Sequence, residues 1–210
     1  MLLNLAIACL GTVGVDVSQP VSQESWSCLT QPGGQGPIEF AVARVYRSGG
    51  SVDPNGAATI RAAREAGIKY VDGYIFPCAT CGSPEAQVNA TKAALDAAGA
   101  IVGMLWYDVE TYEWPADQTA NRKFVAGLIE AGDALGVTAG IYSGERSWSA
   151  IVGNWTYASD RGMPLWYAHY DGVAAFSDFT PFAGWTAPSI KQYLGSHESC
   201  GAGVDYNWYP

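Results

Sequence analysis

The sequence predicts an α/β fold, a single-domain irregular TIM-like barrel in which strands and helices alternate at first and strands dominate at the end. Apolar strand-like runs alternate with helix-like stretches along much of the chain, which is typical of parallel βαβ units. Eight candidate strands occur, enough to close a barrel. Little helical sequence separates the last strands, so we expect the barrel to finish with shorter, partly antiparallel strands. An open, doubly wound sheet is the alternative.

The predicted strands are short runs rich in β-branched and aromatic residues, and turn-forming residues separate them. In chain order they cover residues 13–17, 40–46, 68–76, 101–108, 137–142, 164–170, 189–194 and 203–208.

The predicted helices are recognised by their ends as well as by their periodicity. Residues 54–66 are alanine-rich and are followed by a glycine, a common helix stop. Ser83 and Pro84 supply an N-cap and a first helical position. Asp117 can cap a third helix, in which apolar residues recur at helical spacing. Beyond it the helical pattern weakens to a short stretch at 145–152.

The composition indicates a folded protein and excludes some partners. Hydrophobic residues make up 49% of the 210 residues and charged residues 15%, as in a globular domain. The formal net charge is −9, and lysine and arginine form no cluster. Nucleic-acid binding needs a basic surface, and anionic membranes attract basic segments. We therefore expect no nucleic-acid partner and no membrane insertion, and we expect a monomer.

The first 14 residues resemble a secretory signal peptide. They are apolar, carry no charged side chain and are too short to span a bilayer as a helix. Cleavage is expected after Gly11 or Gly14, and the second site would leave residues 15–210 as a single folded domain. The alternative is that this segment is a buried first strand. We expect a secreted protein, found outside the cell or in an acidic lysosomal or phagosomal compartment.

The cysteines agree with export. Cys9 lies in the predicted signal peptide, and four cysteines remain, which suggests two disulfides with three possible connectivities. Zinc binding by the C-x-x-C pair would need a second pair at similar spacing, which the sequence lacks, and redox chemistry would need a thioredoxin-like context. A structural role is favoured. The four residues are Cys28, Cys78, Cys81 and Cys200.

Carboxylates follow several of the predicted strands, at the end of a barrel where active sites lie. Asp108 and Glu110 are two residues apart, so in extended chain they point to the same side. Two carboxyl groups flanking one bond are what glycoside hydrolysis requires, an acid for the leaving oxygen and a carboxylate for the developing positive charge. Asp16 and Asp205 also follow strand-like runs. When the Asp-x-Glu motif is taken alone, the alternative interpretation is a pair of surface carboxylates in a loop.

Several motifs occur together in an order that resembles the glycoside hydrolase family 25 lysozymes, in particular their short eukaryotic secreted branch. The resemblance runs from about Gly14 to the C-terminus, and the ordered set is more specific than any single motif. The motifs are GVDVS at 14–18, WYDVE at 106–110, GIYS at 140–143, PLWYA at 164–168 and GVDYN at 203–207, with WSC at 26–28 and FPCATCG at 76–82.

This resemblance implies a (β/α)5(β)3 barrel and a muramidase that hydrolyses the β-1,4 bond between N-acetylmuramic acid and N-acetylglucosamine in bacterial peptidoglycan. It implies Glu110 as general acid, and Asp108 as the group that stabilises the transition state or the attacking acetamido group of the substrate. Asp16 and Asp205 would shape the field and hold water or substrate. No cofactor is implied.

Other residues have a possible function and a simpler structural one. We place the aromatic rings of Tyr74, Tyr142 and Trp166 at the sugar groove, although each could be core. Arg44 and Asp72 lie within strand patterns, where an inward arginine paired with a carboxylate favours structural support.

Two histidines and two asparagines bear on metal binding and on glycosylation. His169 and His197 are isolated in sequence and have no ligand-like spacing, so we expect no metal site. Asn89 and Asn154 fit the N-glycosylation pattern, which often goes unused.

Three other functions compete with a lysozyme. A chitinase-like hydrolase usually has alternating aspartates before the catalytic glutamate, and here Met104 and Trp106 occupy those positions. A non-catalytic glycan-binding barrel could have lost the acid, but Glu110 is present. A secreted interaction protein without a sugar ligand would not need carboxylates at strand ends.

Overall fold

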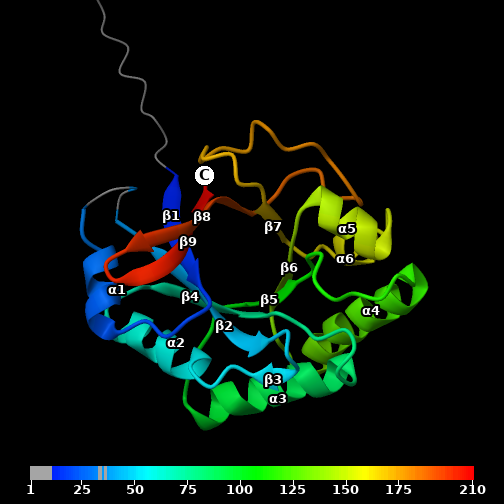
Figure 1. Ribbon diagram of the computed structural model, residues 1–210, viewed down its shortest axis with the longest axis horizontal. Coiled ribbons are helices and arrows are strands. Elements are labelled where there is room, and N and C mark those ends of the chain that lie inside the picture. Colours follow the sequence, from blue (N-terminus) through cyan, green and yellow to red (C-terminus); the bar gives the residue numbers. More distant parts are fainter. Residues whose placement is uncertain (1–10, 33–34, 36) are drawn as a thin grey trace, which may run out of the picture.

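The computed structural model describes residues 11–32, 35 and 37–210, which form a barrel with helices along part of its outer face (Figure 1). Residues 1–10, with Cys9 and most of the predicted signal segment, lie outside the described residues. The strands are β1 (Thr12–Val17), β2 (Phe40–Arg47), β3 (Ser51–Val52), β4 (Tyr70–Ile75), β5 (Leu105–Asp108), β6 (Ala139–Ser143), β7 (Leu165–Ala168), β8 (Ile190–Ser199) and β9 (Ala202–Tyr209). The helices are α1 (Gln23–Leu29), α2 (Gly56–Glu65), α3 (Pro84–Ala97), α4 (Gln118–Ala134), α5 (Glu145–Val152) and α6 (Tyr157–Asp160).

The sheet closes because β1 pairs with both β2 and β9. The order is β1-β9-β8-β7-β6-β5-β4-β2, and β3 pairs with the end of β2 outside this ring. Strands β1, β2 and β4 to β8 all run in the same direction, and β9 alone among the barrel strands is antiparallel to its two neighbours, β8 and β1. The predicted barrel is confirmed, and the open sheet is wrong.

The last two strands differ from the prediction in length. Strands β8 and β9 have 10 and 8 residues and form an antiparallel hairpin, whereas β7 has 4 residues. They are therefore longer than expected, not shorter. The hairpin pairs out to Ser199 and Ala202, and its exposed residues His197 and Glu198 show that this part extends past the barrel wall.

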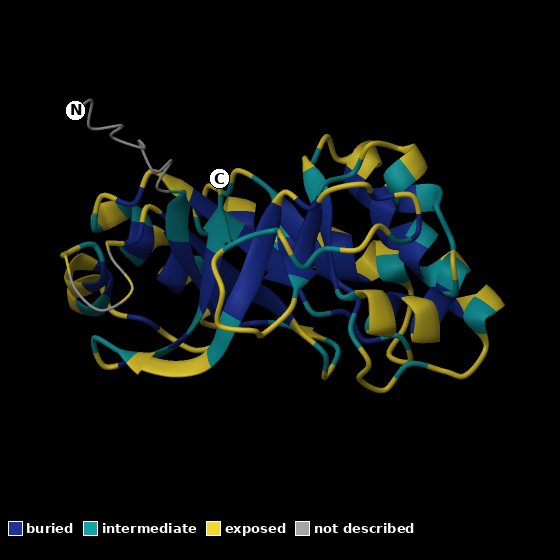
Figure 2. Ribbon diagram, turned by 90° about the horizontal axis from the view of Figure 1, so that it is seen from above, coloured by how far each residue is buried: buried dark blue, intermediate teal, exposed yellow. Residues whose placement is uncertain are grey.

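The alternation of side chains along each strand separates two hydrophobic layers. On β5, Leu105 and Tyr107 belong to the core between the barrel and the helices, whereas Trp106 belongs to a smaller cluster inside the barrel. Figure 2 shows the buried strands at the centre and the exposed residues on the outer faces of the helices. The interior cluster consists of Phe40, Val42, Tyr74, Trp106, Tyr142, Trp166 and Ile190.

The helix starts follow the predicted caps. The Ser83 side chain accepts a hydrogen bond from the Ala86 N–H, and Asp117 accepts from the N–H groups of Thr119 and Ala120. Helices α1 and α6 were not predicted. They have 7 and 4 residues, too few for a clear helical period. No described helix combines the length and apolar character needed to cross a membrane.

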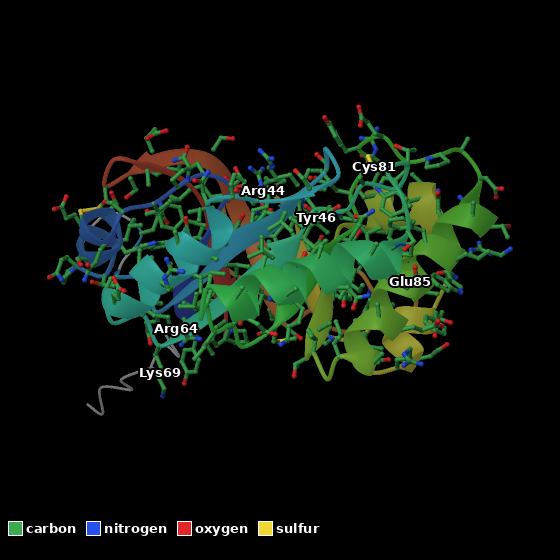
Figure 3. All side chains as sticks on the ribbon, turned by 90° about the horizontal axis from the view of Figure 1, so that it is seen from below. Arg44, Tyr46, Arg64, Lys69, Cys81 and Glu85 are labelled. Atoms are coloured by element: carbon green, nitrogen blue, oxygen red, sulfur yellow. A yellow bond between two sulfur atoms is a disulfide. The ribbon has the colours of Figure 1, made fainter. Side chains whose placement is uncertain are left out.

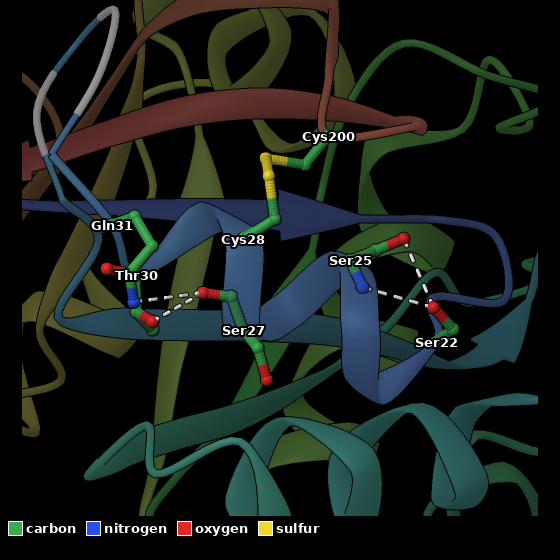
Figure 4. The surroundings of a disulfide bond; sticks show 7 residues. All are labelled: Ser22, Ser25, Ser27, Cys28, Thr30, Gln31 and Cys200. Atoms are coloured by element: carbon green, nitrogen blue, oxygen red, sulfur yellow. Dashed lines mark hydrogen bonds between the residues drawn. A yellow bond between two sulfur atoms is a disulfide. The ribbon is translucent and has the colours of Figure 1, made fainter.

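Two disulfides settle the pairing that the sequence left open. Cys28 of α1 is joined to Cys200 at the turn between β8 and β9, and the two residues are 172 positions apart (Figure 4). Cys78 and Cys81 are joined within the loop after β4, which gives the C-x-x-C pair a structural bond.

Removing the long-range disulfide should cost more stability than removing the short one. A cross-link stabilises mainly by restricting the unfolded chain, and the effect grows with loop length. We expect Cys28→Ser with Cys200→Ser to lower the free energy of unfolding by about 2–5 kcal/mol. The matched control is Cys78→Ser with Cys81→Ser, measured by denaturant unfolding under the same conditions. Equal losses for the two pairs would contradict this account.

Candidate active site

All of the predicted site residues line one cavity of about 210 Å³. The four carboxylates line it together with the three aromatic residues that we placed at the sugar groove. The full lining is Asp16, Ser18, Arg44, Tyr74, Phe76, Asp108, Glu110, Tyr142, Trp166, Tyr170, Gln192 and Asp205.

Asp205 differs from the other carboxylates in its position along its strand. We expected each acid at the C-terminal end of a strand, and Asp108 is the last residue of β5. Asp205 instead lies in the first half of β9. Because β9 runs antiparallel to β1, its first half lies at the same end of the barrel as the end of β1, and Asp205 is paired directly with Asp16.

Asp108 and Glu110 are held by the residue between them. Val109 is fully buried, its N–H donates to Tyr142 O (2.9 Å) and its carbonyl accepts from Ser143 Oγ (2.7 Å). This anchors the chain just after β5 and places both flanking carboxyl groups on the cavity wall. Asp108 is buried, and its Oδ1 has no hydrogen-bond partner among the described residues.

Asp16 accepts two side-chain hydrogen bonds on one oxygen. Gln192 Nε2 and Asn207 Nδ2 each donate to Asp16 Oδ2 at 2.7 Å. Asn207 is itself fixed by Trp166, whose Nε1 donates to Asn207 Oδ1 at 2.7 Å. The pKa of Asp16 is raised to about 8: burial is the main cause, the nearby Asp205 adds to it, and the two hydrogen bonds oppose it.

The other three carboxyl groups also hold protons more tightly than usual. Burial raises the pKa of Glu110, and the charge of Asp205 adds to the effect. Burial raises the pKa of Asp108 well above its usual range, and Glu110 and Asp16 add to it while Arg44 opposes it. Burial likewise raises the pKa of Asp205. The cluster therefore retains protons at a pH where isolated carboxyl groups are ionised.

The three predicted aromatic residues line the cavity with largely buried side chains. Tyr74, Tyr142 and Trp166 are 8%, 5% and 2% exposed, and their rings meet edge to face. The exposed ring at the cavity is that of Tyr170, which follows β7 and was not predicted. Phe76, also unpredicted, lines the cavity and packs on the exposed ring of Tyr112.

Arg44 and Asp72 make structural contacts, as their positions in the strand pattern indicated. Arg44 lines the cavity, but its Nε donates to Asp53 Oδ2 (2.9 Å) and its Nη2 to Ser18 O (2.6 Å). Asp72 accepts from Trp106 Nε1 (3.0 Å) and from the Met104 N–H (2.9 Å) inside the barrel. Figure 3 shows Arg44 on the side of the molecule that carries Cys81, away from Arg64 and Lys69.

His169 is not isolated in space, although it is in sequence. Its ring lies with Asp171 and Asp178 in a group whose ligand atoms fall within 4.8 Å of one another. The fully buried Lys191 ammonium group donates to Asp171 Oδ2 (2.8 Å) and Asp178 Oδ1 (2.7 Å). Lysine thus supplies the positive charge that these carboxylates need.

Gln192 is the central site residue that sequence reasoning missed. It lies on β8 and is buried, and its amide bonds to two of the predicted carboxylates. The sequence did contain a signal: Gln192 is two residues after Ile190, so in a strand its polar side chain shares the inward face with that apolar residue.

Comparison with known proteins shows the family and the fold of this chain. A family profile described as "Lysozyme-like protein 1" matches residues 8–193. The chain is 42% identical to "Probable GH family 25 lysozyme 4" of Dictyostelium discoideum, over 100% of this chain and 98% of that protein. A bacterial lysozyme from Streptomyces coelicolor has a similar structure, with a TM-score of 0.75, 21% identity and coverage of 95% and 92%.

A further structural likeness is to the modular autolysin LytC of Streptococcus pneumoniae, solved in complex with a synthetic peptidoglycan ligand. Its TM-score is 0.72 at 17% identity, and the match covers 95% of this chain and 47% of that one.

A closed barrel with a carboxylate-lined cavity at one end, in a chain with lysozyme relatives, defines a glycoside hydrolase. The chain belongs to glycoside hydrolase family 25, the lysozyme-like family.

The buried carboxyl group of Asp16 should make the protein less stable as pH rises. In the unfolded chain an aspartate titrates near pH 4, whereas the pKa of folded Asp16 is raised to about 8. The stabilisation is complete below the unfolded pKa and is lost as pH rises through the folded one. We expect Asp16→Asn, which cannot ionise, to raise the thermal midpoint by roughly 5 °C at pH 8. Near pH 4 the gain should vanish, so a pH-independent gain would contradict this prediction.

Proposed function

We propose that this enzyme hydrolyses the β-1,4 bond between N-acetylmuramic acid and N-acetylglucosamine in bacterial peptidoglycan. Glu110 is the general acid that protonates the leaving oxygen. The observation that carries this assignment is the position of Glu110: it is half-buried, lines the cavity beside Asp108, and its pKa is raised. A carboxyl group in such surroundings keeps its proton at a pH where a solvated one has lost it, which a general acid requires.

Asp108 binds the group that develops positive charge. Asp108 lines the cavity, and its buried Oδ1 lacks a hydrogen-bond partner among the described residues; buried acceptors of this kind are rare unless a ligand or water completes them. The N–H of a substrate acetamido group is a donor of the right kind. Such a bond favours the charged form of Asp108 and opposes the effect of burial on its pKa. The peptidoglycan ligand of the autolysin supports this class of substrate.

Product analysis tests the bond that is cut. Purified peptidoglycan is digested, the products are reduced, and the newly formed reducing sugar is identified by mass spectrometry. Reduced muramic acid supports the proposal. Reduced glucosamine at the new ends, or no cleavage, would overturn it.

Glu110→Gln should remove activity while keeping the fold. Glutamine has the same shape and still forms hydrogen bonds, but it cannot donate a proton to the leaving group. General acid catalysis contributes about 10²–10⁴-fold, so turnover of purified peptidoglycan should fall by at least the lower value. The thermal midpoint of the variant serves as the folding control. Near-normal turnover in a folded variant would show that another residue is the acid.

Hydrolysis should be fastest under mildly acidic conditions and decline on the alkaline side. The pKa of Glu110 is raised by burial and by Asp205, so the acid is active up to a higher pH than a solvated glutamate and is lost as pH rises through that value. Lysis rates measured at constant ionic strength from about pH 5 to about pH 9 test this. A rate that climbs throughout that range is incompatible with Glu110 as a protonated acid.

We also propose that the protein is exported, with the N-terminal segment as its signal peptide. The two disulfides support an oxidising compartment. Cleavage after Gly11 would leave β1 whole, because that strand begins at Thr12. N-terminal sequencing of the protein from the culture medium of producing cells tests both statements.

A further inference from the structure

The side-chain amide of Gln192 uses its whole hydrogen-bonding capacity inside the cavity. Its Nε2 donates to Asp16 Oδ2 (2.7 Å) and to Asp205 Oδ2 (3.3 Å). Its Oε1 accepts from the hydroxyl groups of Tyr142 (2.5 Å) and Tyr170 (2.6 Å). A primary amide has two donor hydrogens and two acceptor lone pairs, so Gln192 has nothing left to offer a substrate. It can act only through the residues that it holds.

These partners determine which way the amide faces. Asp16 and Asp205 are paired across β1 and β9, and the charge of Asp205 adds to the effect of burial in raising the pKa of Asp16. An N–H group between two carboxyl groups is attractive, whereas the amide oxygen in that place would be repulsive. The two tyrosine hydroxyls, themselves 2.8 Å apart, donate to that oxygen on the opposite side. The amide therefore has one favourable orientation.

Asp205 connects this arrangement to the proposed acid. The Ser196 N–H donates to Asp205 Oδ1 (2.6 Å) and Gln192 donates to Oδ2, so both oxygens of Asp205 are fixed. The charge of Asp205 is in turn one of the two causes that favour the protonated form of Glu110. A change in the orientation of Asp205 would thus alter the field at Glu110.

We propose that Gln192 is the positioning residue of this active site, and that its amide fixes Asp16 and Asp205 relative to each other and so sets the arrangement of the carboxyl groups that share the cavity with Glu110. The part that concerns Glu110 rests on the proposed function. The part that concerns Asp16 and Asp205 does not, because it can be measured without substrate.

Several ionisable groups around the amide bear on its pH dependence. They come from every strand that faces it, and Arg44 is the cation among the residues lining this cavity. The groups are Asp16 on β1, Arg44 on β2, Tyr74 on β4, Asp108 and Glu110 at the end of β5, Tyr142 on β6, Tyr170 after β7 and Asp205 on β9.

A second buried glutamine provides a matched control. Gln87 on α3 is 2% exposed, like Gln192, and among the described residues its amide bonds to the backbone of Cys78 alone, at 2.8 Å and 3.0 Å. Gln87→Met therefore removes a buried amide that has no contact with the carboxylates. It reports what loss of a structural glutamine does to stability and activity.

The experiment compares Gln192→Met, Gln192→Glu and Gln87→Met. For Gln192→Met we expect kcat on peptidoglycan fragments to fall about tenfold or more, with KM changed by no more than about twofold, because binding groups remain while the acid is misplaced. The Asp16 carboxyl titration, followed by carbon NMR without substrate, should move up by about one pH unit because a donor to its charged form is lost. Gln87→Met should lower the thermal midpoint and leave the titration and the pH profile unchanged.

Gln192→Glu separates positioning from packing. When protonated, glutamate has the size of glutamine and one O–H to donate; when ionised, it places a third negative charge beside Asp16 and Asp205. We expect this variant to recover activity at acidic pH and to lose it steeply as pH rises, whereas Gln192→Met stays low throughout.

The outcomes distinguish this inference from the proposed function. If both Gln192 variants behave like Gln87→Met, with reduced stability but unchanged titration and pH profile, the inference is overturned. If wild-type enzyme releases no muramic acid ends but the Asp16 titration moves as expected, the positioning of the carboxyl pair is supported and the proposed function fails.

Discussion

The position of β1 between a parallel neighbour and an antiparallel one decides where the charged groups of the cavity lie. Pairing with β2 and β9 closes the barrel, and the register with β9 sets Asp16 opposite Asp205. A shift of one residue in that register would turn Asp205 outward and bring Val204 to the cavity. The inward faces of three further strands then supply Asp108, Tyr142 and Gln192. The chemistry of the site is therefore a consequence of how the sheet is closed.

Gathering four carboxyl groups in a partly buried space is unfavourable, and the direct hydrogen-bond donors to Asp16 are neutral groups. Arg44 is the cation that lines the cavity, and it is already engaged with Asp53 and the Ser18 carbonyl. The direct partners of Asp16 are the neutral amides of Gln192 and Asn207. Neutral donors orient carboxyl groups without stabilising the charged form as strongly as a cation would. This arrangement is consistent with the raised pKa values of the four acids.

Local signals in the sequence predicted much of the fold. The Ser83-Pro84 pair and Asp117 identify helix starts because capping depends on neighbouring residues only. The start of β5 was placed too early, at residue 101 instead of Leu105. Gly103 lies against Asp72 and Ile101 is 74% exposed, so this stretch approaches the barrel before strand pairing with β6 begins.

The site was predictable where its residues are close in sequence and not where they are distant. Asp108 and Glu110 share a side because of the two-residue period of extended chain. Gln192 forms hydrogen bonds with Tyr142, which is 50 positions away in the sequence, and with Asp16, which is 176 positions away. Only the closed sheet brings these together. The antiparallel direction of β9 places Asp205 at the cavity. That direction is also set by long-range pairing, which no local pattern encodes.

The bond between Cys28 and Cys200 has a consequence for the integrity of the molecule. It joins the first helix to the last hairpin, so the chain between them is a covalent ring of 172 positions. Strand β1 and the end of β9 are also paired, from Thr12 with Tyr209 onward. A protease that cuts one loop within this ring opens it without producing two separate fragments. The protein can thus be cut once within this ring and still remain one covalently connected molecule.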